Sequence, residues 1–217
     1  LDKLLKKIFK LNLSKQIIVV DDGSTDKSRK ILNRYKKKID KIISHKKNQG
    51  KGSAIISAKK YIKGKYVIIQ DADLEYYPRD IIKIFKYAKK NKLKAVYGSR
   101  VLNKNKFQNT KNFTHFIRIW GNSFLTYVSN KLNDQNLTDA HTCYKLFQSN
   151  IFKKINLSEK GFAFCPEITT KISNRKIRIY EVPISYKGRT YQEGKKISSA
   201  DGIEALYCLV KYKKFLT

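Results

Sequence analysis

The sequence has no methionine, only three cysteines, and no apolar run long enough to cross a membrane. A membrane-spanning helix needs about 20 consecutive, mostly apolar residues, so no span is predicted. No signal peptide is visible either. The cysteines, Cys143, Cys165 and Cys208, are odd in number and lack metal-type spacing. This favours ordinary thiols in a reducing compartment over a disulfide framework or a zinc site.

Acidic residues are also scarce, with 17 Asp and Glu against 48 Lys and Arg, and the formal net charge is +31. Such a charge suggests nucleic acid as a partner. Most of the excess, however, is lysine spread along the chain beside abundant isoleucine and asparagine, which indicates a general compositional bias. No recognised nucleic-acid-binding motif is present, so nucleic acid is the less favoured partner. A basic surface also favours anionic membranes.

The chain shows no internal repeat and no low-complexity linker, and its 217 residues suit one domain, residues 1–217. Strand-like and helix-like segments alternate from Gln16 to Ser99. This alternation predicts an α/β fold with a mostly parallel sheet and flanking helices. After Arg100 the pattern becomes α+β.

The most informative stretch is an apolar, β-branched run that ends abruptly at carboxylates. Val67-Ile-Ile-Gln is followed by Asp71, Asp73 and Glu75. Buried parallel strands have this composition, and ligands of open α/β sheets bind just beyond the strands' carboxyl ends. Crowded carboxylates repel one another, and a hard divalent cation that also binds phosphate would neutralise them. A solvated, Asp-rich turn is the alternative interpretation.

A second strand ends in the same way, and a glycine-bearing loop follows it. Ile17-Ile-Val-Val is followed by Asp21 and Asp22, and Gly23 permits a sharp turn. The loop of residues 48–54 carries Lys51 between two glycines and opens another helix, a position that suits anions. Two acidic strand ends and one basic glycine loop so close together in the sequence are hard to explain as sheet edges alone.

These motifs resemble those of a known family. Asp21-Asp22-Gly-Ser-Thr-Asp, Asp71-Ala-Asp73-Leu-Glu75 and Gly-Ser-Arg100 are similar to the family 2 glycosyltransferases with the GT-A fold. Within that family the chain is most similar to the polyprenyl-phosphate group, the dolichyl-phosphate mannosyltransferases. The resemblance implies a Rossmann-like sheet in a nucleotide-sugar half, residues 1–100, and an acceptor half, residues 101–217. The family's first strand is absent, so we expect the sequence to lack its native N-terminus.

The resemblance also implies a donor site with a metal ion. The residues expected to bind the nucleotide sugar are Asp21, Asp22, Lys51 and Asp71, with Arg189 and Lys195 in a segment that closes over the diphosphate. The ion, Mg²⁺ or Mn²⁺, is expected on Asp71, Asp73 and Glu75, although the family usually has glutamine where Glu75 stands.

On the acceptor side, the resemblance implies a phosphate held by arginines. The residues expected there are Arg100, Arg118, Asn122 in place of the family's serine, Asp139 and Glu167. The catalytic set implied is Asp71, Asp73, Arg100 and Arg118. A polyprenyl or dolichyl phosphate is already ionised near neutral pH and needs no general base. The resemblance further implies inverting transfer from a donor of the GDP-mannose or UDP-glucose type.

Two helices are expected to carry apolar stripes, over residues 113–128 and 200–215. A stripe of this kind can face the core or a membrane surface, and the basic C-terminus favours the surface. We expect peripheral attachment to the inner, cytoplasmic face of the cell membrane. Three other functions stay open: transfer to a sugar hydroxyl in envelope polysaccharide synthesis, with Asp139 or Glu167 as the base, nucleotidyl transfer, and nucleic-acid binding.

Overall fold

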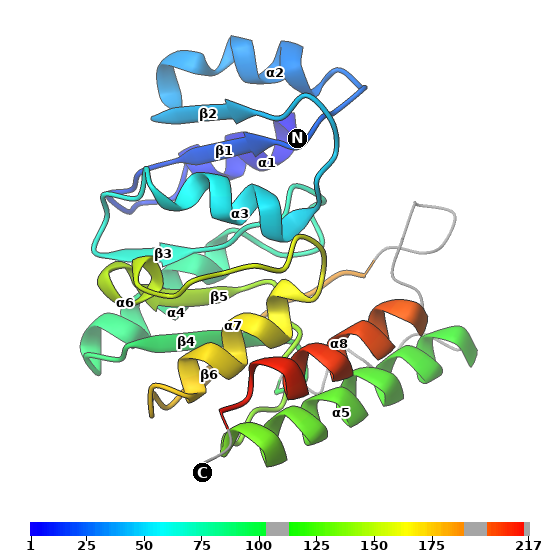
Figure 1. Cartoon of the computed structure of the whole chain (residues 1–217). Coiled ribbons are helices and arrows are strands. Elements are labelled where there is room, and N and C mark those ends of the chain that lie inside the picture. Colours follow the sequence, from blue (N-terminus) through cyan, green and yellow to red (C-terminus); the bar gives the residue numbers. More distant parts are fainter. Residues whose placement is uncertain (103–112, 189–198, 215–217) are drawn as a thin grey trace.

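The structure is a computed structural model that describes residues 1–102, 113–188 and 199–214, with side chains for all of these except residues 113–119 and 199. Helices and strands alternate along most of the chain (Figure 1). In order they are α1 (Asp2–Phe9), β1 (Ile18–Asp21), α2 (Ser28–Arg34), the short 3₁₀ helix η1 (Lys36–Lys38), β2 (Lys41–Ser44), α3 (Lys51–Lys59), β3 (Tyr66–Ile68), α4 (Arg79–Lys90), β4 (Ala95–Ser99), α5 (Phe113–Asn133), β5 (Lys145–Gln148), α6 (Ser149–Lys153), α7 (Phe164–Ser173), β6 (Tyr180–Pro183) and α8 (Ser199–Tyr212).

The strands form two hydrogen-bonded groups. β1 and β2 pair in parallel, and the other four follow the order β3-β5-β4-β6. Only β5 runs against its neighbours, since it pairs antiparallel with β3 and β4, whereas β4 and β6 are parallel. The predicted α/β class with flanking helices is therefore confirmed, but the sheet is mixed, because the inserted strand β5 makes antiparallel pairs on both of its sides. Among the described strands, β1 and β3 are edge strands that do not pair with each other.

Side chains of β4 and β5 alternate between two cores, as the period of two in a strand requires. Tyr97 and Phe147 point to one side and pack with Ile168 of α7. Val96 and Leu146 point to the other side and pack with residues of α4. Both faces of this sheet are thus covered by helices, which explains why every residue of β4 is buried.

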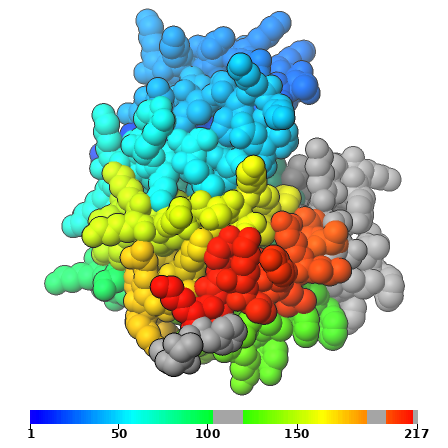
Figure 2. Space-filling model, viewed as in Figure 1, coloured from blue at the N-terminus to red at the C-terminus, as the bar shows by residue number. Residues whose placement is uncertain are grey.

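Three helices of the second half pack on one another beyond the sheet. α7 lies against the sheet, and α5 and α8 lie side by side on its outer side (Figure 1). In the space-filling view, α8 in red and orange adjoins α5, in bright green at the lower edge (Figure 2). No helix in the described part of the chain is long and apolar enough to cross a membrane.

Candidate functional site

The carboxylates that follow β3 lie in one turn but have different partners. Lys51 Nζ donates to Asp71 Oδ2 at 2.6 Å, and the Glu75 N–H donates to Asp73 Oδ1 at 3.1 Å. The Glu75 carboxylate accepts a hydrogen bond from the Tyr186 hydroxyl at 2.9 Å. In the described ranges no group of three or more His, Cys, Asp and Glu side chains is placed to hold a metal ion. The geometry therefore does not gather the three predicted ligands.

The acidic end of β1 is held by basic side chains and backbone N–H groups. Asp21 is buried and accepts hydrogen bonds from Arg29 Nε at 3.0 Å and from the Ser24 N–H at 2.9 Å. Asp22 accepts the N–H groups of Gln49 and Gly50 at 3.0 and 2.8 Å. The glycine loop that we predicted to suit an anion is thus occupied in part by a carboxylate of the protein itself.

His45, which the sequence analysis did not select, orients Asp22. Its Nδ1 lies 2.6 Å from Asp22 Oδ1, and its Nε2 lies 2.9 Å from the Ser57 hydroxyl on α3. Burial alone would raise the pKa of Asp22, but the hydrogen bonds from His45 and from the loop N–H groups outweigh it and lower the pKa. A lone histidine directly after β2 was the only sequence signal for this role.

The glycines of the loop have a packing role. Gly50 has a φ of 94°, and a Cβ there would lie 2.5 Å from the Lys160 carbonyl oxygen. A Cβ on Gly52 would meet the Glu159 carbonyl oxygen at 1.9 Å. The segment around residue 160 therefore packs directly on the start of α3, which only glycine permits, and this packing places Lys51 beside Asp71.

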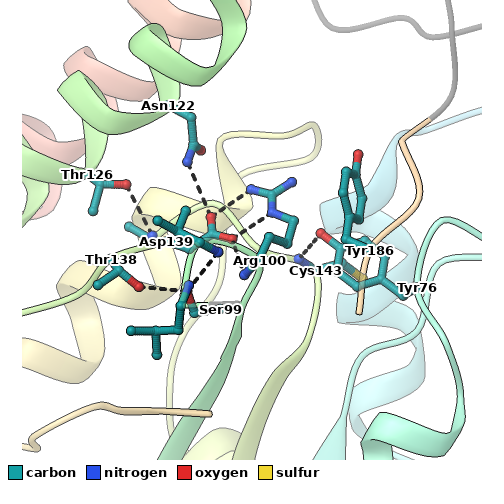
Figure 3. Close-up of polar contacts among 12 residues, drawn as sticks. Tyr76, Ser99, Arg100, Asn122, Thr126, Thr138, Asp139, Cys143 and Tyr186 are labelled. Atoms are coloured by element: carbon teal, nitrogen blue, oxygen red, sulfur yellow. Dashed lines mark hydrogen bonds and ion pairs between the residues drawn. The ribbon is translucent and has the colours of Figure 1, made fainter. Parts of the chain in front are cut away.

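A buried ion pair forms the centre of the second half of the site (Figure 3). Arg100, directly after β4, donates to Asp139 through Nε and Nη2, both at 2.6 Å, and through its backbone N–H at 3.1 Å. Asn122 Nδ2 of α5 reaches the same carboxylate at 3.4 Å. Burial raises the pKa of Asp139, but the positive charge and hydrogen bonds of Arg100 dominate and lower it. Three predicted acceptor residues therefore do meet.

A second carboxylate fixes the turn that carries Asp139. Glu181 of β6 accepts the N–H groups of Thr138 and Asp139, at 2.7 and 3.0 Å, and the Thr138 hydroxyl at 2.8 Å. Thr126 of α5 accepts the N–H of Ala140 at 3.2 Å. The sequence analysis missed Glu181, whose only signal was one carboxylate inside an otherwise apolar strand.

Tyrosines join the two halves of the site. The Arg100 guanidinium lies 5.1 Å from the centre of the Tyr186 ring, whose hydroxyl donates to Glu75. The neighbouring Tyr76 packs edge-on against Tyr186 and accepts the Cys143 N–H at 2.9 Å. The turn that follows β3 and the Arg100–Asp139 pair therefore belong to one continuous site.

Two cationic or ionisable side chains lie beneath this site. Lys145 is fully buried, donates to the Ala140 carbonyl at 2.6 Å and lies 3.9 Å from the centre of the Tyr97 ring. Burial lowers the pKa of Lys145 to about 8 and that of His141 to about 4. The Nε2 atom of His141 is buried and has no hydrogen-bond partner among the described residues.

The remaining predicted residues differ in placement. Glu167 is fully buried in the first turn of α7. Its carboxylate accepts hydrogen bonds from the N–H groups of Ser158 and Glu159 and forms an ion pair with Lys171. These contacts give Glu167 a structural role. The side chain of Arg118, four residues before Asn122 in α5, lies outside the described residues, as do Arg189 and Lys195.

The α/β sheet with flanking helices and carboxylates at its strand ends has the form of a GT-A domain. A family model described as "Glycosyl transferase family 2" matches residues 1–156. The chain belongs to this family and is a nucleotide-sugar-dependent glycosyltransferase.

Curated relatives share a little over a quarter of their residues with this chain. The UDP-N-acetylglucosamine–dolichyl-phosphate N-acetylglucosaminyltransferase of Methanococcus voltae is 28% identical over 216 residues, 91% of this chain and 84% of that protein. A dolichyl-phosphate beta-glucosyltransferase of Trichomonas vaginalis is 27% identical over 183 residues, 81% of this chain and 55% of that protein. The chain thus corresponds to about half the length of the second relative.

A solved structure shares the fold. Glucosyl-3-phosphoglycerate synthase from Mycobacterium tuberculosis, in complex with Mn²⁺, uridine diphosphate and glucosyl-3-phosphoglycerate, has a TM-score of 0.71 at 13% identity. The match covers 98% of this chain and 74% of that one. At this level of identity the likeness shows the GT-A fold alone.

Proposed function

We propose that the protein transfers a sugar from a nucleoside diphosphate sugar to the phosphate of a polyprenyl or dolichyl lipid, on the cytoplasmic face of a membrane and with inversion. The observation that carries this proposal is Arg100, a cation fixed by Asp139 and adjoining the carboxylate turn through Tyr186. Both curated relatives described above are named as acting on dolichyl phosphate, which supports the same acceptor.

On the donor side, we assign Asp21, Asp22, Lys51 and Asp71 to the nucleotide sugar. Mg²⁺ and Mn²⁺ are usually held by one or two carboxylates together with substrate phosphates and water. Asp71 and Asp73, two residues apart in one turn, fit such an arrangement without Glu75, which is turned toward Tyr186. When bound there, the ion would stabilise the negative charge of the leaving diphosphate.

On the acceptor side, we assign the lipid phosphate to Arg100 and Arg118. In the reaction, a phosphate oxygen forms the bond to the anomeric carbon while the bond to the diphosphate oxygen breaks, and the diphosphate leaves with the electron pair. The phosphate is already ionised, since its second pKa is about 6. Asp139, with its lowered pKa and with Arg100 on both oxygens, is a poor general base, which disfavours a hydroxyl acceptor.

The test is a panel of UDP- and GDP-sugars offered with polyprenyl phosphate or with soluble sugars, in the presence of Mn²⁺ or Mg²⁺. We expect product only with the lipid phosphate, and we expect EDTA to abolish the activity reversibly. In Arg100→Gln, the KM for the lipid should rise while the KM for the donor stays unchanged. Loss of one hydrogen bond from a charged group corresponds to roughly ten- to a hundredfold in KM. Transfer to a sugar hydroxyl but not to the lipid phosphate would refute the proposal.

A further inference from the structure

Two adjacent helices expose large apolar side chains in regular stripes. On α5 the stripe has the spacing i, i+4, i+7, and on α8 the same spacing recurs. We call these side chains the aromatic face: Trp120, Phe124 and Tyr127 of α5 with Ile203, Tyr207 and Val210 of α8. Single exposed apolar residues are normal on any protein. A set of this size on neighbouring helices indicates an interaction surface.

We propose that the aromatic face docks on an anionic lipid bilayer. This inference deepens the proposed function, since it names the surface that brings the enzyme to an embedded acceptor. Tryptophan and tyrosine favour the membrane–water interface. Each stripe also continues into a lysine whose ammonium lies near the stripe's tyrosine ring, Lys131 at 5.8 Å from Tyr127 and Lys211 at 5.7 Å from Tyr207.

The positive charge of the chain favours a bilayer over a second copy of the chain as the partner of the aromatic face. Lys213 and Lys214 extend the basic end of α8, and the whole chain has a net charge of +31. α8 carries two acidic residues, Asp201 and Glu204, Asp134 directly follows α5, and Glu159 pairs with Lys211 at 2.9 Å. Two such chains repel each other, whereas phosphatidylserine or phosphatidylglycerol head groups attract lysines.

The opposite side of α5 holds the acceptor site. Asn122 reaches Asp139, Thr126 accepts the Ala140 N–H, and Asn130 donates to the Leu137 carbonyl at 2.7 Å. A helix with its side chains is about 10 to 12 Å across. Docking by the aromatic face would therefore hold Arg100 and Asp139 about one helix diameter from the lipid head groups, which suits a phosphate at the bilayer surface.

Trp120 is the only tryptophan in the chain and is 67% exposed, so it reports directly on docking. With vesicles containing phosphatidylglycerol, we expect its fluorescence to shift to shorter wavelength and to be quenched by brominated lipids. Neutral phosphatidylcholine vesicles and 0.5 M salt should reduce both effects. An unchanged Trp120 spectrum in the presence of bound vesicles would overturn the proposal, because binding would then use another surface.

Matched variants separate the aromatic face from the general charge. Tyr127→Ser/Tyr207→Ser should reduce vesicle co-sedimentation at least ~tenfold, because interfacial binding scales with buried apolar area. Tyr87→Ser, on α4 at the opposite face of the sheet, is the control and should bind normally. Equal binding by all variants would mean that charge alone drives association, and a dimer in solution lost with Tyr207→Ser would mean self-association. Either result would overturn the proposal.

The proposed function can fail separately. Transfer to a short, water-soluble prenyl phosphate without vesicles should be the same in Tyr127→Ser/Tyr207→Ser and in the unaltered protein. If docking is found without any such transfer, the acceptor assignment is wrong and the aromatic face remains supported. If transfer is found but Trp120 does not contact lipid, only the docking proposal is wrong.

Discussion

Replacing Asp139 by asparagine should destabilise the protein more than any comparable change on its surface. Asp139 is fully buried and accepts three hydrogen bonds from Arg100, the two side-chain bonds at 2.6 Å each. Removing one partner of a buried ion pair costs about 3 to 5 kcal/mol, because it leaves an uncompensated charge. The Arg100 side chain is 18% exposed, so water offsets part of this cost and we expect ~3 kcal/mol.

The assay is urea and thermal unfolding followed by circular dichroism at pH 7. A loss of ~3 kcal/mol corresponds to a Tm lower by roughly 6 to 12 °C for a chain of this size. Because the pKa of Asp139 is lowered in the folded protein, its stabilising effect is present above the ordinary value of 3.8 and is lost as the pH falls through the folded value. The difference between the two proteins should therefore persist down to about pH 4.

Asp2→Asn is the matched control, since its partner Lys6 is 60% exposed and water screens the pair, and we expect a much smaller loss of stability. The double variant Arg100→Met/Asp139→Leu should be more stable than Asp139→Asn, because it removes both members of the pair and leaves neither charge uncompensated. A loss below about 1 kcal/mol for Asp139→Asn, or a double variant less stable than the single one, would refute this account of the site.

Three further changes have defined outcomes. Glu181→Gln should raise the KM for the acceptor about tenfold with little effect on the donor KM, since it disturbs the turn that presents Asp139; equal effects on both would indicate general misfolding. Between pH 6.5 and 4, the free energy of unfolding of the native protein should fall by about 3 kcal/mol more than that of His141→Gln. The reason is that His141, with a pKa of about 4, stays neutral in the folded protein while the same histidine takes up a proton in the unfolded chain. Lys51→Met should weaken binding of a nucleoside diphosphate, measured by calorimetry, by about tenfold, and unchanged binding would remove Lys51 from the donor site.

The features that the sequence predicted are those with local signals. An apolar β-branched run followed by Asp71 and Asp73 indicates a strand end by itself, and Lys51 between glycines indicates a helix start. The structure has β3 and α3 at these places. Helical spacing likewise predicted the stripe on α5, because a period of 3.6 residues is visible within a few turns.

The features that the sequence did not predict depend on distant pairs. Arg100 and Asp139 were both assigned to the acceptor region, but nothing in a single sequence indicates that they bind each other across 39 positions. The same holds for Glu181 with Thr138 and for His45 with Asp22. Glu75 was predicted as a metal ligand from its spacing, yet the distant Tyr186 hydroxyl determines where its carboxylate points.

Acidic residues are scarce in this chain, and several of those in the site are paired with basic side chains. With 48 basic side chains in the chain, four carboxylates of the site meet cationic or basic partners: Asp21 with Arg29, Asp22 with His45, Asp71 with Lys51 and Asp139 with Arg100. Repulsion between carboxylates, which by itself suggests a metal ion, is therefore partly relieved by the protein. A diphosphate that arrives at Lys51 must compete with Asp71 for the ammonium group, and a divalent cation must compete with Lys51 for the Asp71 carboxylate. A diphosphate on Lys51 would free the Asp71 carboxylate for the metal ion, and a metal ion on Asp71 would free the Lys51 ammonium for the diphosphate. We therefore expect each ligand to bind more tightly when the other is present.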